Sequence, residues 1–372
     1  MAEPLKDSFG PDVPVAVAAM IAAVEPDFDA DRFVAGCLDG YDDLELTPRA
    51  RKIADVMAEY LPDDRRRALL VLTESLGVET GELSGMDGFR YLPHVYFVAD
   101  YGLEHFEESM TAQYELTKRF TAEFSIRAYV ERYPDETLAR LRIWAVDPNV
   151  HVRRLVSEGT RPRLPWAPRL RGFQHDPAPV LDLLEVLKDD PKEYVRRSVA
   201  NNLNDISKDH PELVVDVAAR WWEEGGDDRR RLVRHGLRTL IKRGDADALA
   251  VLGFSADSAA TVAGASVAPP EVAIGGKVAI AIDVINPSDG EAGALVDLRI
   301  HFVKSNGSTS PKVFKGAELH LPPGDSGTVR KTVSVRQHST RAHYPGAHRV
   351  DALVNGVALP IGSFELLESG GG

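Results

Sequence analysis

The chain has 372 residues with a net charge of −13, and 44% of the residues are hydrophobic. This length and apolar content predict two or three folded domains and exclude a disordered chain. The single cysteine, Cys37, excludes an internal disulfide framework, and the N-terminus MAEPLKDSFG lacks the basic and apolar regions of a signal peptide, so we predict a protein of the reducing bacterial cytoplasm. The longest apolar stretch, residues 15–24, is too short to span a bilayer, and we expect no membrane segment.

Residues 13–253 have the spacing of amphipathic helices. Apolar residues recur at every third or fourth position, and the pattern breaks at clusters of Pro, Gly and Asp. Several breaks place Asp next to Pro, as in LPDDRRR, YPDETLA and DDPKEYV. Asp accepts hydrogen bonds from the free amides of a first helical turn, and Pro fits that turn. The sequence therefore predicts an all-helical domain over residues 1–254.

Two segments within this helical part repeat each other. DPNVHVRRLVSEG and DPKEYVRRSVANN match at an offset of 43 residues. The offset aligns three polar positions: Arg153 with Arg196, Arg154 with Arg197, and Glu158 with Asn201. A period of this size is typical of two-helix solenoid repeats of the HEAT type, in which the second helices line one face. We therefore predict a HEAT-like α-helical solenoid.

Weaker echoes extend the repeat in both directions. Arg119 with Glu123 precedes it and Arg231 with His235 follows it, so four helices are predicted to carry an arginine followed four positions later by a polar group. Each pair by itself is an ordinary helix-surface ion pair worth about 0.3 kcal/mol. Because the pairs recur at the repeat period, we expect them to share one face of the stacked helices.

The segment RPRLPWAP, residues 161–168, follows the first repeat helix. Its three prolines predict a stiff, extended backbone from which Arg161, Arg163 and Trp166 project, and Arg169 follows directly. Residues 116–243 hold about 25 Lys and Arg against about 20 Asp and Glu, although the rest of the chain is acidic. Guanidinium groups match phosphate oxygens, so this region predicts a nucleic-acid ligand.

Carboxylates among these arginines would repel a phosphate backbone, which predicts a structural or chemical role for them. Glu158, Glu123 and Asp205 are candidates, and Asp205 is expected on the polar face of a helix from residue 193 to about 206. Any of them could stabilise positive charge at C1′ of a deoxyribose and orient a water while an N-glycosidic bond breaks. The ring face of Trp166 would stabilise a cationic base or sugar.

From about residue 255 the pattern changes to alternating apolar and polar residues, as in KVAIAIDVIN and ALVDLRIHFV. The runs predict an immunoglobulin-like antiparallel β-sandwich over residues 255–368, without the Cys and Trp signature of antibodies, and a flexible tail at 369–372. The Arg- and His-rich segment at 336–349 is a candidate DNA contact, and a purely structural domain is the alternative.

Three stretches of the chain resemble the DNA alkylation repair family, AlkC branch: RRLVSEGTRPRLPWAP, YVRRSVANNLNDISKDHPE and PLKDSF. The likeness covers the helical two-thirds of the chain. It implies a DNA glycosylase that hydrolyses the N-glycosidic bond of N3-alkylated bases, such as 3-methyladenine and 3-methylcytosine, without flipping the base. It also implies base excision repair on double-stranded DNA at the bacterial nucleoid, with no metal and no cofactor. We predict a monomer.

The resemblance places the family's catalytic site on Glu123, Glu158, Trp166 and Asp205. The predicted DNA contacts are Arg119, Arg153, Arg154, Arg161, Arg163, Arg169, Arg196, Arg197, Asn201 and Arg231. The alternative function is a non-catalytic HEAT-repeat scaffold for nucleic acid or protein, which has no need of a carboxylate in its groove. A carbohydrate-active enzyme would also use paired carboxylates, but aromatic residues usually line such clefts, and arginine dominates this segment.

Overall fold

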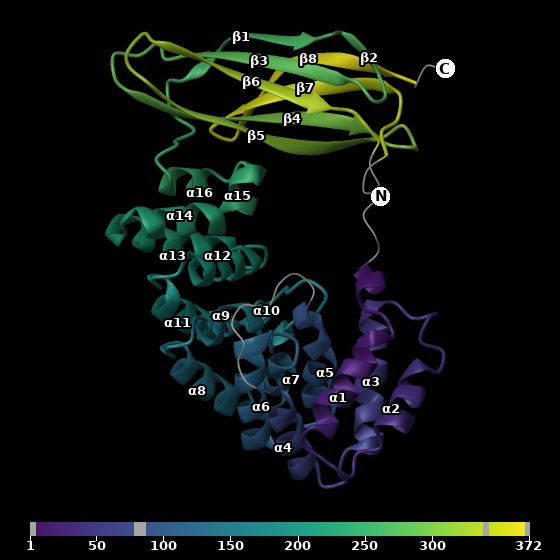
Figure 1. Ribbon diagram of the computed structural model, residues 1–372. Helices are drawn as coiled ribbons and strands as arrows, with labels where there is room; N and C mark the ends of the chain where they lie inside the picture. Colours follow the sequence, from purple (N-terminus) through teal and green to yellow (C-terminus); the bar gives the residue numbers. More distant parts are fainter. Residues whose placement is uncertain (1–4, 78–86, 338–341, 369–372) are drawn as a thin grey trace. The chain divides into compact units, whose positions relative to one another are not determined.

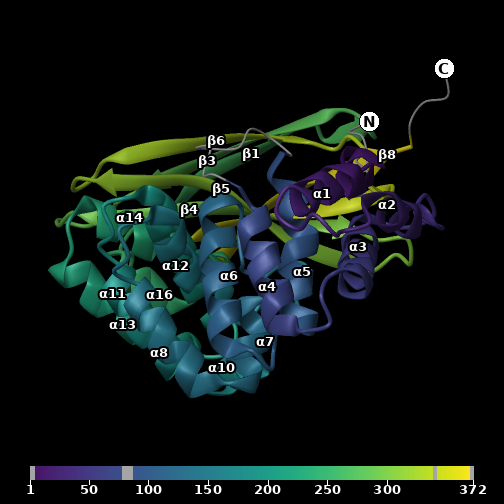
Figure 2. The same cartoon turned by 60° about the horizontal axis from the view of Figure 1, so that its bottom comes forward.

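The computed structural model describes residues 5–77, 87–337 and 342–368 (Figures 1 and 2). Helices occupy the described chain up to Val251, and strands begin at Thr261, so the predicted α-helical part followed by a β-sandwich is confirmed. The predicted flexible tail lies outside the described residues, as do residues 338–341 of the Arg- and His-rich segment.

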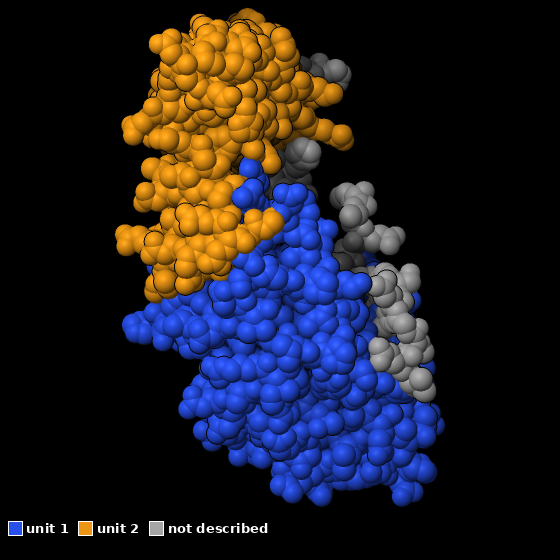
Figure 3. Space-filling view, turned by 90° about the vertical axis from the view of Figure 1, so that its left-hand side faces the viewer, with its two compact units in different colours: residues 1–209, 227–236 blue, residues 210–226, 237–372 orange. Residues whose placement is uncertain are grey.

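Two compact units divide the chain, and Figure 3 colours them separately. The first unit is formed by residues 1–209 and 227–236, and the second by residues 210–226 and 237–372. The second unit thus contains helices as well as all the described strands. The domain boundary between residues 254 and 255 therefore stays a prediction.

The helices of the described chain have ordinary lengths, and none is long and apolar enough to cross a membrane. In the first unit they are α1 (Asp12–Ala22), α2 (Ala30–Leu38), α3 (Leu46–Tyr60), α4 (Arg65–Ser75), α5 (Leu92–Tyr101), α6 (Phe106–Arg119), α7 (Ile126–Arg132), α8 (Pro134–Trp144), α9 (Val150–Gly159), α10 (Arg171–His175), α11 (Ala178–Leu187), α12 (Glu193–Ile206) and α14 (Asp227–Gly236), with short 3-10 turns at Leu5–Ser8 and Asp87–Tyr91. In the second unit they are α13 (Pro211–Glu224), α15 (Arg238–Arg243) and α16 (Ala246–Val251).

Helices of the first unit stack on their counterparts in the next repeat. α3 packs on α5, α9 on α12, and α12 on α14. The predicted apolar stripe of α12 is confirmed, because Val195, Val199, Leu203 and Ile206 are all buried. A β-carbon at Gly236 of α14 would lie 2.9 Å from a methyl group of Leu203, so this glycine permits the close contact between α12 and α14. The first unit is therefore a HEAT-like stack.

His94 on α5 is fully buried, and neither nitrogen of its ring has a hydrogen-bond partner. Burial lowers the pKa of His94 from 6.5 to about 3. The unfolded chain takes up a proton at this side chain near pH 6.5, whereas the folded chain takes it up only near pH 3. We therefore expect His94 to lower the free energy of unfolding by about 1.4 kcal/mol for each pH unit between these values, and to have no effect above pH 7.

Urea unfolding of wild-type and His94→Phe protein at several pH values checks this prediction. The variant should lose stability less steeply than the wild type as the pH falls below 6.5. His175→Phe is the control, because His175 is exposed at the end of α10. Parallel curves for wild-type and His94→Phe protein would contradict the prediction.

The strands of the second unit form two sheets. They are β1 (Thr261–Ala268), β2 (Glu271–Ala273), β3 (Lys277–Ile285), β4 (Ala292–Val303), β5 (Thr309–Leu321), β6 (Ser326–Ser334), β7 (Gly346–Val354) and β8 (Val357–Leu367). One sheet has the order β1-β3-β6 and the other β2-β8-β7-β4-β5. All pairs are antiparallel except β2 with β8, a parallel pair that the alternating pattern did not predict.

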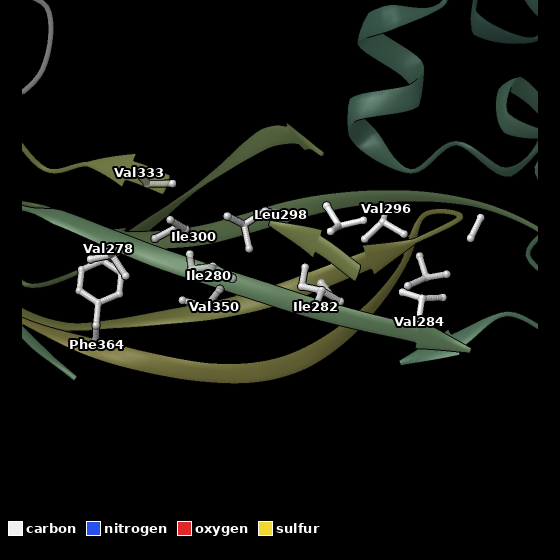
Figure 4. Close-up of a cluster of buried hydrophobic side chains, with 14 of the residues drawn as sticks. Val278, Ile280, Ile282, Val284, Val296, Leu298, Ile300, Val333, Val350 and Phe364 are labelled. Atoms are coloured by element: carbon white, nitrogen blue, oxygen red, sulfur yellow. The ribbon is translucent and has the colours of Figure 1, made fainter. Parts of the chain in front are cut away.

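The sandwich core is built from the apolar positions of these alternating strands. Figure 4 shows Val278, Ile280, Ile282 and Val284 of β3 in one buried cluster with residues of β4, β6, β7 and β8. Every second residue of β3 contributes to this cluster because successive side chains of a strand point to opposite faces. The alternation seen in the sequence therefore explains the core.

Candidate functional site

A cleft of about 390 Å³ in the first unit brings carboxylates, arginines and aromatic rings together. Its aromatic lining residues are Phe89, Tyr96, Phe120, Phe124, Trp166 and Tyr194. Its polar lining residues are Thr47, Thr121, Glu123, Arg154, Glu158 and Arg161. The aromatic lining is richer than we expected from the sequence, so the scarcity of aromatic residues is no argument against a sugar in this cleft.

Glu158, in the last turn of α9, lines the cleft and is only 6% exposed. Its Oε1 accepts a hydrogen bond from Nη1 of Arg161 at 2.6 Å, and its Oε2 accepts one from Oγ of Ser198 at 2.6 Å. Nη2 of Arg154 lies 3.6 Å from Oε1. Neighbouring helices and the following loop therefore hold both oxygens of this carboxylate in place.

The surroundings of Glu158 keep its side chain ionised. Burial by itself raises the pKa, because a charged group loses its hydration. The positive charges of Arg154 and Arg161, together with hydrogen bonds from Ser198 and Arg161, outweigh burial and hold the pKa of Glu158 below its usual value. Such a carboxylate can stabilise a positive charge and accept a hydrogen bond from water, but it has no proton to donate at neutral pH.

Glu123 lies in the loop between α6 and α7 and also lines the cleft. Its Oε2 accepts hydrogen bonds from Nη1 of Arg154 at 2.5 Å and from Oγ1 of Thr121 at 3.1 Å. Arg154 therefore bridges Glu123 and Glu158, and these three residues lie together in the structure, as expected.

The predicted pairing of Arg119 with Glu123 on one helix is wrong. α6 ends at Arg119, and Phe120 leaves the helical conformation with φ −144° and ψ −105°. Arg119 instead donates from Nη1 to Oε2 of Glu115 at 2.7 Å, one turn earlier on α6. The break in the helix is what frees Glu123 to turn toward Arg154.

Asp205, which was expected on the polar face of α12, is buried, and only 1% of it is exposed. Its Oδ2 accepts a hydrogen bond from Nε of Arg161 at 2.9 Å, and its Oδ1 accepts one from Nζ of Lys208 at 2.8 Å. The loop after α9 supplies Arg161, which covers this turn of α12. Asp205 is absent from the cleft lining and reaches it only through Arg161, which also binds Glu158.

Trp166 lies in the loop after α9 with its side chain at the cleft and 73% of its surface exposed. Its φ of +64° is in the left-handed region, which a bulky residue seldom adopts. The prediction that this loop is extended is wrong in part, because residues 162–163 and 165–166 form turns. Residues held in sparsely populated backbone conformations cluster at active sites and ligand-binding sites.

The other arginines of this loop differ in their surroundings. Arg163 makes two parallel hydrogen bonds to Asp209, from Nε at 3.0 Å and from Nη2 at 2.5 Å. Arg169 is exposed and, within the described residues, makes no hydrogen bond or ion pair. Arg163 therefore fastens the loop, whereas Arg169 can contact a ligand.

The first arginine of each repeated Arg-Arg pair, Arg153 or Arg196, binds the loop before its own helix and a carboxylate in or just before the first turn of the next repeat helix. Nε of Arg153 donates to the carboxylate of Asp190 at 2.6 Å, and its Nη1 donates to the carbonyl oxygen of Asp147 at 2.8 Å. Arg196 repeats this arrangement, with Nη1 donating to the carbonyl oxygen of Asp190 at 2.6 Å and Nη2 lying 3.0 Å from Asp228. The arginine recurs in the sequence because, in both repeats, it donates a hydrogen bond to the carbonyl oxygen of an aspartate six residues earlier and pairs with a carboxylate of the next repeat.

Arg197, the second arginine of the later repeat, is exposed, whereas its counterpart Arg154 lies in the cleft. Arg197 on α12 is exposed and, within the described chain, has no hydrogen-bond or ion-pair partner. It lines a second hollow of about 280 Å³ together with Arg231, which pairs with Asp228. Oδ1 of Asn201 lies 3.0 Å from Nε2 of His235, so these two predicted face residues do contact each other across α12 and α14.

Several residues of the site were not predicted from the sequence, although local signals exist for some of them. Phe120 and Phe124 are near neighbours of Glu123 in the chain, and both line the same cleft. Tyr194 occupies the repeat position of His151, and the Arg154 guanidinium lies 5.6 Å from the centre of its ring. Ser198, which binds Glu158, carries no such signal, because its partner is 40 residues away.

Comparisons with known proteins agree on a family. Residues 261–368 match the family model described as "Uncharacterised protein YhaZ, C-terminal Ig-like domain". The uncharacterized protein YhaZ of Bacillus subtilis (strain 168) is 34% identical over 332 residues, which cover 89% of this chain and 90% of that protein. The structure of Pseudomonas fluorescens alkylpurine DNA glycosylase AlkC, bound to DNA containing an abasic site analog, has a TM-score of 0.90 and 36% identity over 98% of this chain and 100% of that one. This chain therefore belongs to the AlkC branch of the DNA alkylation repair family.

Proposed function

We propose that this protein is a DNA glycosylase that hydrolyses the N-glycosidic bond of N3-alkylated bases, such as 3-methyladenine and 3-methylcytosine, in double-stranded DNA. The observation that carries the proposal is the ionised Glu158, buried beside Glu123 and Arg154 in a cleft whose wall includes the exposed ring of Trp166. The AlkC structure, a DNA-bound alkylpurine glycosylase that aligns with nearly the whole chain, supports it. The enzyme would act as a monomer in base excision repair at the bacterial nucleoid.

The proposed chemistry needs electrostatic stabilisation more than proton transfer. An N3-alkylated base is a cation, so it leaves C1′ as a neutral molecule without being protonated, and the positive charge passes to the sugar. The carboxylate of Glu158 would stabilise that charge and orient the water that adds to C1′. The Trp166 ring would present its negative face to the cationic base or sugar, without the base being flipped into a pocket.

The three candidate carboxylates have different places in this proposal. Glu158 and Glu123 line the cleft and would face the sugar. Asp205 acts as a positioning residue, because it holds Arg161 against Glu158. Four of the predicted DNA contacts form intramolecular hydrogen bonds instead, and we assign them a structural role: Arg119, Arg153, Arg163 and Arg196.

Exposed arginines are the proposed phosphate contacts. Arg197 and Arg169 are exposed, and the Arg231 side chain is largely so. We expect Arg197→Met to reduce the slope of log K against log salt concentration for binding duplex DNA by about 1, because one phosphate contact and its released counterion are lost. Arg153→Met should leave the slope unchanged, because that guanidinium is bound to Asp190. Equal slopes for wild-type and Arg197→Met protein would remove Arg197 from the interface.

The test of the proposed function is the release of free base from duplex DNA that carries 3-methyladenine. Purified protein should release the base and leave an abasic site, and undamaged DNA should stay intact. A non-catalytic scaffold would bind the same duplexes and release nothing. Methylated DNA without protein is the control for spontaneous depurination.

A further inference from the structure

Arg127 on α7 is a buried arginine whose guanidinium, among the described residues, donates hydrogen bonds to backbone oxygens only. Its Nη1 donates to the carbonyl oxygens of Gly159 at 3.0 Å and Arg161 at 2.7 Å, and its Nη2 donates to that of Pro168 at 2.5 Å. These acceptors stand at the end of α9, at the start of the following loop and near the end of that loop. One side chain therefore binds both ends of the loop that carries Trp166.

The loop at residues 160–170 has few backbone hydrogen bonds of its own. Its three prolines lack an N–H group. Within the loop, the N–H of Ala167 donates to the carbonyl oxygen of Leu164 at 3.4 Å and that of Leu170 to the carbonyl oxygen of Pro162 at 3.2 Å. Trp166 holds a left-handed conformation that costs about 1 to 2 kcal/mol for a residue with a β-carbon. Such a conformation persists only where the surroundings impose it.

A buried guanidinium is a costly way to hold a loop unless its position matters. Burial lowers the pKa of Arg127 to about 10, and its Nε has no hydrogen-bond partner among the described residues. The planar guanidinium nonetheless reaches three carbonyl oxygens at once. The ammonium group of a lysine carries its donors on one nitrogen and cannot span acceptors that lie this far apart in the chain. Close packing supports the arrangement, since a β-carbon on Gly159 would lie 2.6 Å from a methyl group of Ile126.

We infer that Arg127 is a positioning residue for the proposed glycosylase site, because it fixes both ends of the loop that places Arg161 against Glu158 and Trp166 at the cleft. The inference rests on the proposed function for its effect on rate. Its structural half, the anchoring of the loop, can be tested without activity.

The experiment compares wild-type protein with Arg127→Lys, Arg127→Met and the control Arg132→Met. Arg132 is an exposed residue of the same helix whose guanidinium lies over the ring of Tyr133. Hydrogen exchange followed by mass spectrometry should show the amides of the loop at residues 160–170 exchanging roughly tenfold faster in both Arg127 variants than in the wild type. The exchange rates of amides in the helices should stay unchanged. Unchanged exchange in this loop would overturn the inference, and Arg127→Lys keeps the test valid if Arg127→Met does not fold.

Single-turnover release of 3-methyladenine then tests the positioning role. Arg127→Lys should be slower by roughly 10- to 100-fold, with nearly unchanged affinity for duplex DNA containing an abasic-site analogue. In a Trp166→Ala background the same change should cost less, because one of the two groups that the loop places at the site is gone. Losses that multiply fully in the double variant would mean that Arg127 does not position Trp166 and would overturn the inference. A wild-type protein that releases no base would contradict the proposed function, while hydrogen exchange would still decide the anchoring.

Discussion

Replacing Glu158 by Gln is expected to slow base release by roughly 10²- to 10³-fold and to leave DNA binding intact, because a fixed, buried negative charge beside a developing positive sugar is worth several kcal/mol. Glutamine keeps the size of the side chain but removes that charge. Arg161 keeps its bond to Asp205, so the guanidinium is not left unpaired. Single-turnover release of 3-methyladenine measures the effect.

The control for this change is Glu136→Gln on α8, where the side chain is exposed and does not line the cleft. It should release base at the wild-type rate. The pH dependence adds a second check: since the pKa of Glu158 is held below its usual value, wild-type activity should not fall between about pH 8 and about pH 5 through protonation of this residue. Undiminished base release by Glu158→Gln would remove Glu158 from its proposed role. A wild-type protein that releases no base, together with tighter DNA binding by Glu158→Gln, would favour a scaffold.

Replacing Trp166 by Gly is expected to slow base release by about 30-fold without destabilising the fold. The ring is mostly exposed, so its removal forfeits little buried apolar surface. Glycine adopts a φ of +64° without the steric cost that tryptophan bears, so the free energy of unfolding should stay level or rise by about 1 kcal/mol. The rate falls because the face of the indole no longer meets a cationic base or sugar, a contact worth about 2 kcal/mol when desolvated.

Two measurements on the same samples separate these effects. Urea unfolding reports the stability, and single-turnover kinetics report the chemistry. Trp166→Phe serves as the matched variant, because it keeps an aromatic face and should retain a substantial part of the rate. A rate for Trp166→Gly equal to that of the wild type would mean that the ring has no part in the reaction, whereas a large loss of stability would mean that the loop depends on the ring for its structure.

The sequence by itself determined the classes of structure and much of the local geometry. The apolar stripe of α12 and the alternating residues of β3 follow from periodicities of 3.6 and 2, which depend only on near neighbours in the chain. The internal repeat predicted stacked helices, and it placed Arg154 near Glu158 because both lie on one short helix. Trp166 stood out because three prolines surround it.

What each arginine binds was decided only by the tertiary structure. The bonds from Arg161 to Asp205 and from Ser198 to Glu158 join residues 44 and 40 positions apart, across the interface of α9 with α12. Periodicity predicts which way a side chain points but not which partner the next repeat presents to it. For the same reason, Arg153 and Arg197 had equal standing in the sequence although one is bound to Asp190 and the other is exposed.

The role of Arg127 shows this division most clearly. Its place on a helix is local and predictable, but its acceptors are carbonyl oxygens of Gly159, Arg161 and Pro168, and backbone oxygens carry no signature in a sequence. Their positions result from how α7 packs on the end of α9 and how the following loop turns. The composition and spacing of residues thus determined the helices, the strands and the chemical groups available, while packing between distant segments determined which of those groups meet at the cleft.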